Sequence, residues 1–132
     1  MAPTMPVTET VDVQNRLVHT VATGLVTRDE FMAHIERTWT DGQFSDCDEI
    51  VDAMSADASQ LSHEDVIAII NSGVEFDGEE MPKLALCVNS DLEYGIGRMF
   101  GTMRELHDKN SREIQVFCDL ESAEAWIGKR IG

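Results

Sequence analysis

Segments with the pattern of a β-strand alternate with segments with the pattern of an α-helix along most of this chain. Across the 132 residues the predicted order is β-β-α-β-α-β-α-β-α. Strands that are joined through helices run parallel and connect by right-handed crossovers. The sequence therefore predicts an α/β fold, with a mixed, mostly parallel sheet of five strands and about four helices.

The stretch 90–119 carries the clearest pattern. Ser90 and Glu93 have the spacing of a capping box, in which each side chain binds a free backbone N–H at the start of a helix. An apolar stripe then recurs at steps of three and four residues, formed by Leu92, Ile96, Met99, Met103 and Leu106. Residues 113–118 alternate and favour a strand. This stretch predicts a long helix that leads into a buried strand.

Similar signals mark the other helices. Thr27 with Glu30, and Ser62 with Asp65, have the spacing of capping boxes, and Asp119 is a good cap for the last helix. The last helix has an inner stripe of Ala123, Trp126, Ile127 and Ile131. The helices are predicted near 28–40, 63–75, 91–109 and 120–130.

The strands are predicted near 10–14, 17–23, 47–53, 83–89 and 113–118. Residues 14–16 (Gln-Asn-Arg) predict a tight turn between the first two strands, because Asn tolerates the left-handed region. Residues 55–60 are small and polar and predict a loop. Residues 1–8 include two prolines and predict a flexible N-terminus, followed by a single domain over 9–132.

The charge limits the possible partners. The chain has 25 acidic and 10 basic residues, a formal charge of −15. Nucleic acids and anionic lipids bind through cations, so we expect no nucleic-acid partner, and membrane contact would be peripheral and need clustered cations. No apolar run approaches the roughly 20 residues that cross a bilayer, and residues 1–20 do not resemble a secretory signal. A cytoplasmic location is expected.

The cysteines are odd in number and show no CxxC spacing. Cys47, Cys87 and Cys118 each fall in a predicted strand, where a free cysteine behaves as a small apolar residue. Three buried, reduced thiols are therefore expected, which agrees with a cytoplasmic location.

The C-terminal half resembles a known family. A strand is followed by D-L-E-Y-G-I-G-R-M-F and then by V-F-C-D-L-E-S-A-E-A-W-I. The chain resembles the SpoIIAA-like family, relatives of the STAS domain that are mostly uncharacterised bacterial proteins. The residues that carry the resemblance are Tyr94, Gly95, Arg98, Met99, Phe100, Val116, Phe117, Asp119, Leu120, Ala123, Ala125, Trp126 and Ile127.

The resemblance implies a fold and two functions. The fold would be a single SpoIIAA/STAS-like domain whose first strand is antiparallel to the second. The family is similar in fold to lipid-carrier domains and to anti-sigma-factor antagonists, and carriage of an apolar ligand has been suggested for it. Antagonists present a phosphorylatable serine in an Asp-Ser-Ser-Gly turn. Here Ser62 stands in a similar place without the Ser-Gly pair, which favours a plain helix cap.

No catalytic or metal-binding pattern is evident. His19, His34, His63 and His107 fit no spacing of metal ligands, and the acidic loops lack a calcium-loop pattern. No nucleophile stands beside a base in a recognised motif. We therefore expect a protein that is not an enzyme and that needs no metal or cofactor.

A ligand site is predicted along the helix at 91–109. Arg98 suits an anionic head group, while Phe100, Met103 and Phe76 would supply apolar contacts. Alternatively, Arg98 forms a surface ion pair with a carboxylate such as Glu105, and the apolar residues are plain core.

Two functions follow as hypotheses. The first is a non-enzymatic domain that binds a small apolar or lipid-like ligand. The second is a regulatory module that docks onto a protein partner.

Overall fold

The computed structural model describes residues 7–38, 47–57, 62, 64–65, 82–89 and 113–131. Within these residues the fold is α/β, with one mixed, mostly parallel sheet of five strands and two helices. The strands are β1 (Val7–Asp12), β2 (Leu17–Leu25), β3 (Asp48–Asp57), β4 (Lys83–Val88) and β5 (Glu113–Phe117), and the helices are α1 (Arg28–Thr38) and α4 (Leu120–Ile127). The predicted helices near 63–75 and 91–109 lie almost entirely outside the described residues.

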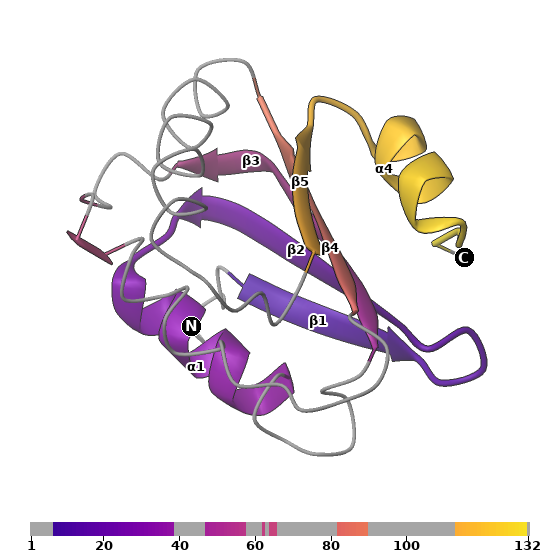
Figure 1. Cartoon of the computed structure of the whole chain (residues 1–132). Coiled ribbons are helices and arrows are strands. Elements are labelled where there is room, and N and C mark those ends of the chain that lie inside the picture. Colours follow the sequence, from indigo (N-terminus) through magenta and orange to yellow (C-terminus); the bar gives the residue numbers. More distant parts are fainter. Residues whose placement is uncertain are drawn as a thin grey trace.

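The strands lie side by side in chain order. β1 is antiparallel to β2, and the pairs β2–β3, β3–β4 and β4–β5 are parallel. The predicted fold class is thereby confirmed at this level. Helices α1 and α4 lie on opposite faces of the sheet (Figure 1).

The two faces bury separate apolar clusters because strand side chains alternate. The cluster on the α1 face consists of Val7, Ala22, Val26, Val51, Ala53, Ala56, Leu84 and Val88, with Phe31 packed against it. The cluster on the α4 face consists of Leu17, Ile50, Ala85, Cys87, Ala123 and Ile127, with Trp126 and Ile131 packed against it. β4 contributes to both clusters, as its nearly continuous apolar sequence predicts.

The β1–β2 hairpin is present, but two details differ from the prediction. β1 begins at Val7, within the segment that was assigned to a flexible terminus, because Val7 pairs with Ala22 and is buried. In the turn, Arg16 rather than Asn15 has a positive φ, of 53°. Asn15 is instead held by Asp12, which accepts hydrogen bonds from its backbone N–H and its side-chain amide.

β3 is longer than predicted. Residues 55–57, expected in a loop, continue the strand and pair in register with residues 23–25 of β2. A register irregularity between Val21 and Thr23 precedes this pairing. The pairing continues one residue past the end of β2, because the Val26 N–H donates to the Asp57 carbonyl at 3.0 Å. Small polar side chains thus form a strand here because a neighbouring strand supplies the backbone partners.

Three predicted caps are observed. The Thr27 N–H donates to Glu30 at 3.0 Å, and Ser62 and Asp65 exchange backbone-to-side-chain hydrogen bonds of 3.0 and 3.1 Å. The Ser122 N–H donates to the Asp119 side chain at 2.7 Å at the start of α4. α4 then ends earlier than predicted, because Gly128 takes the left-handed conformation with φ of 80°.

The prediction for the cysteines is partly wrong. Cys47 and Cys87 are buried, but Cys118 is exposed. Cys118 follows the last residue of β5, and Cys47 precedes the first residue of β3. The alternating pattern therefore extended one residue too far at the end of β5, where the chain bends toward α4.

Candidate functional site

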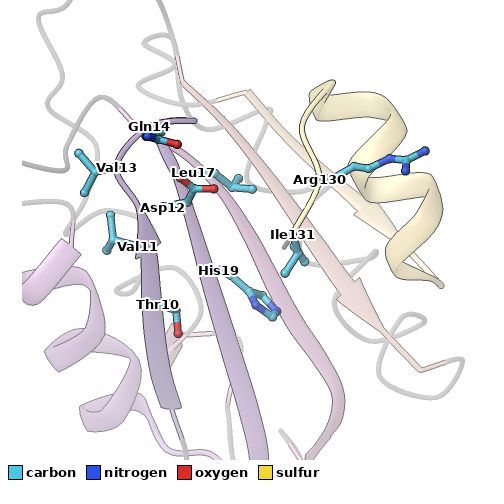
Figure 2. Close-up of a pocket in the computed structure, with 9 residues that line it drawn as sticks. All are labelled: Thr10, Val11, Asp12, Val13, Gln14, Leu17, His19, Arg130 and Ile131. Carbon is cyan, nitrogen blue, oxygen red and sulfur yellow. The ribbon is translucent and has the colours of Figure 1, made fainter.

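A pocket opens on the α4 face of the sheet, over the β1–β2 hairpin (Figure 2). α4 packs mainly against β4, with further contacts to β3 and β5, so it lies to one side of the hairpin. The cavity measures about 520 Å³, within the usual range for small-molecule sites. Its lining residues are Thr10, Val11, Asp12, Val13, Gln14, Leu17, His19, Arg130 and Ile131.

The pocket combines apolar walls with a few polar groups. His19 and Thr10 are register partners on the antiparallel pair, so their side chains leave the sheet on the same face. Among the described residues, Nε2 of His19 is a buried nitrogen atom with no hydrogen-bond partner. A buried polar atom without a partner costs free energy, so this imidazole would gain from a polar partner. Figure 2 shows Arg130 extending away from His19.

The segment that follows α4 forms one wall of the pocket and is held in place by hydrogen bonds and an ion pair. The Ile131 N–H donates to Glu124 at 2.7 Å. Lys129 Nζ lies 2.8 Å from a carboxylate oxygen of Asp48 and donates to the Arg16 carbonyl at 3.3 Å. These contacts fix Ile131 beside the hairpin, so the pocket is part of the folded structure.

A second polar cluster lies on the opposite face, under α1. His34 of α1 reaches between Glu9 of β1 and Glu49 of β3. Its Nδ1 lies 3.1 Å from Glu9 Oε2, and its Nε2 lies 2.7 Å from Glu49 Oε2. The Thr20 hydroxyl donates to the same oxygen of Glu49 at 2.6 Å. We call Glu9, Thr20, His34 and Glu49 the buried array.

The geometry of the buried array favours the imidazolium form of His34. A neutral imidazole has one N–H, whereas here each ring nitrogen faces a carboxylate oxygen, so both nitrogens should donate. Burial by itself lowers the pKa of His34, but the charge and hydrogen bond of Glu49, and then those of Glu9, outweigh it and raise the pKa. The geometry and the direction of this pKa shift together favour a cation between the two carboxylates.

The members of the array differ in their access to solvent. Thr20, His34 and Glu49 are each at most 2% exposed, whereas the Glu9 side chain is 17% exposed. A substrate would have little access to His34 or Glu49, so the array is better suited to holding elements together. In the described part of the chain, no three His, Cys, Asp or Glu side chains are grouped as metal ligands would be.

The pocket and the buried array share two strands. In the β1–β2 register Glu9 pairs with Thr20, and the next pair along is Thr10 with His19. The first pair belongs to the array and the second to the pocket, on opposite faces of the same hairpin. The two sites are therefore one residue apart along each strand.

The predicted site residues Arg98, Phe100, Met103 and Phe76 all lie outside the described residues. Sequence reasoning did not single out His19, His34 or Glu49 as site residues. A signal for the array was present, because Glu49 shares a strand face with Val51, and His34 follows Phe31 by three residues. A carboxylate and an imidazole at core-facing positions require partners.

Comparisons with known proteins leave the family open. No family model matches the sequence, and no curated protein or solved structure is significantly similar to it. Among the described residues, no helix has the length and apolar character that crossing a membrane requires.

Proposed function

We propose that this chain is a non-enzymatic binding domain that takes a small amphipathic ligand into the pocket over the β1–β2 hairpin. The observation that carries the proposal is the cavity of about 520 Å³, one of whose lining residues, His19, has a buried nitrogen without a hydrogen-bond partner among the described residues. We propose further that the fold is a single SpoIIAA/STAS-like domain with four helices, in a bacterial, cytoplasmic protein.

The lining of the pocket supports an amphipathic ligand. Leu17 and Ile131 offer an apolar surface, and an apolar ligand body gains about 25 cal/mol for each Å² that it buries. His19 offers a polar contact, which would orient the ligand. A fatty acid or fatty alcohol of medium chain length has this chemistry.

Two pocket variants test the proposal with a displaceable fluorescent fatty acid, decanoic acid and 1-octanol. His19→Leu keeps an apolar wall but removes the polar contact, so affinity should fall about tenfold, the effect of one good hydrogen bond. Ile131→Trp fills the cavity and should abolish binding of all three compounds. Thr23→Leu is the matched control, because Thr23 is an exposed residue of β2 outside the pocket.

The same titrations separate this pocket from the site predicted along 91–109. If that other site binds the ligand, Arg98→Ala and Phe100→Ala lose affinity while His19→Leu and Ile131→Trp keep it. Binding that survives all four substitutions, or no binding of any compound at micromolar protein, rejects the proposal.

Protein docking is the alternative function. Leu25 and Met54 are exposed large apolar residues on the neighbouring strands β2 and β3, and such residues are common in docking surfaces. Ser62 caps a helix start through its hydroxyl, which supports a role without a phosphorylation switch. A protein captured from host lysate by wild type, but not by Leu25→Asp, would favour docking over ligand binding.

A further inference from the structure

We propose that the buried array is a proton-operated brace that holds strand β1 in place and thereby controls the pocket on the other face of the same strand. The control of the pocket rests on the ligand-binding function proposed above. The brace itself rests on the contacts among Glu9, Thr20, His34 and Glu49 alone.

β1 is the strand that needs a brace. Among the strands that the structure describes, it stands at the edge of the sheet and pairs with β2. An edge strand has backbone hydrogen bonds to one neighbour, so its position depends strongly on side-chain contacts. The contact of Glu9 with His34 ties β1 to α1, and His34 in turn is tied to β3 through Glu49.

The protonation state of His34 determines whether it can donate to Glu9 and to Glu49 at the same time. With both ring nitrogens protonated, His34 donates to Glu9 and to Glu49. When His34 loses a proton, one of its two ring nitrogens can no longer donate, so one of the two hydrogen bonds to the carboxylates is lost. Among the described residues, the groups that face His34 are Glu9 from β1, the Thr20 hydroxyl from β2 and Glu49 from β3.

The tie to Glu9 is the one that should break. Glu49 is 1% exposed, so leaving its carboxylate without a donor would cost more free energy than leaving Glu9 without one. The Thr20 hydroxyl, which donates to Glu49 at 2.6 Å, also holds this carboxylate in position. The remaining N–H of neutral His34 should therefore donate to Glu49. Glu9 is the more exposed carboxylate and can turn toward water. Loss of the proton therefore removes the His34 contact of β1, which loosens this strand at Glu9, and leaves the contact to β3 in place.

The released residue lies next to the pocket. Thr10 follows Glu9 directly and lines the pocket, and its register partner His19 carries the unpartnered nitrogen. A shift of β1 at Glu9 changes the distance between the two pocket walls that Thr10 and Ile131 provide. Ligand affinity should consequently fall as the pH rises.

Hydrogen exchange tests the brace without any ligand. Exchange of the amides in Val7–Asp12 is measured at pH 6.0 and pH 8.5 and corrected for the intrinsic effect of pH on exchange. The protection of these amides should fall about tenfold at the higher pH, the effect of one charge-assisted hydrogen bond. The protection of the amides of Lys83–Val88, in the interior of the sheet, should change little.

Two variants test the cause of the change. Glu9→Gln should show low protection in β1 at both pH values, and His34→Gln should remove the pH dependence of this protection.

Binding of 1-octanol tests the control of the pocket, because this probe does not titrate between the two pH values. Affinity should fall several-fold from pH 6.0 to 8.5 in wild type and stay constant in Glu9→Gln. Glu9→Gln keeps the test valid if His34→Gln fails to fold, since Glu9 is partly exposed.

The outcomes separate the two proposals. The brace is overturned, even if 1-octanol binds, if the hydrogen-exchange protection of β1 in wild type does not change with pH. It is also overturned if Glu9→Gln shows the same pH-dependent protection as wild type. Equal affinity at both pH values despite a change in protection overturns the control of the pocket. A pH-dependent β1 without any binding of 1-octanol supports the brace and overturns the proposed function of the pocket.

Discussion

Nε2 of His34 lies 2.7 Å from Oε2 of Glu49, and each of these residues is at most 2% exposed. The pair joins α1 to β3 through the interior, with the Thr20 hydroxyl as an additional donor to the same oxygen. Burying charges is unfavourable unless they are paired and hydrogen-bonded, and this cluster meets both conditions. The fold around α1 therefore depends on a polar contact inside an otherwise apolar layer.

Removing the carboxylate of this pair should destabilise the protein strongly. In Glu49→Ala the imidazolium loses its closest partner and a cavity forms, so the free energy of unfolding should fall by about 3–5 kcal/mol. Urea unfolding followed by circular dichroism measures the change. Glu9→Gln serves as the comparison and should cost less, because Glu9 is partly exposed. Equal losses in the two variants would contradict the central role of Glu49.

Stability should decrease as the pH rises above neutrality. The pKa of His34 is raised in the folded state relative to 6.5, so the folded state retains this proton where the unfolded state has lost it. The stabilisation is thus complete below pH 6.5 and is lost as the pH rises through the folded-state pKa. Urea midpoints from pH 6 to 9 measure this slope. His34→Gln should flatten it, and an unchanged slope would show that other groups cause the decline.

One thiol should react quickly in the native protein. Cys118 is exposed, whereas Cys47 and Cys87 are buried, and burial, followed by the nearby charges of Asp52 and Asp119, raises the pKa of Cys87 to about 12. A thiol-specific maleimide should therefore label one site rapidly at pH 7 and all three after denaturation. Cys118→Ser should abolish the rapid phase. Rapid labelling that persists in Cys118→Ser would contradict the burial of the other two cysteines.

The contribution of the Asp119 cap of α4 to the stability of the protein should be measurable by substitution. Asp119 accepts hydrogen bonds from the backbone and the hydroxyl of Ser122, so Asp119→Ala should lower stability by about 1 kcal/mol. Asp119→Asn is the matched control and should retain most of the stability, because asparagine is an equally good cap. Thermal unfolding distinguishes the two. A loss in Asp119→Asn as large as in Asp119→Ala would mean that the charge, and not the cap, matters.

Local sequence patterns accounted for much of the described fold. Strand and helix periodicities predicted the α/β class, the five strands and the positions of α1 and α4, because these patterns reflect which side chains can face a core. Capping by Glu30, Asp65 and Asp119 was also predictable, since a cap involves residues three positions apart in the chain.

Element ends were less predictable where a neighbouring strand decided them. Residues 55–57 have no strand pattern of their own and become part of β3 because β2 offers backbone partners for them. The exposure of Cys118 follows from the bend into α4, which no alternation of residue types records.

The sequence by itself determined the fold class, since hydrophobic periodicity and capping act over a few residues. Only the tertiary structure decided the sites. His34 and Glu49 are 15 positions apart, and Glu9 lies 25 positions from His34. The pocket joins the β1–β2 hairpin to Arg130 and Ile131 near the other end of the chain. Such contacts arise when the sheet brings distant segments together, and no spacing along the chain encodes them.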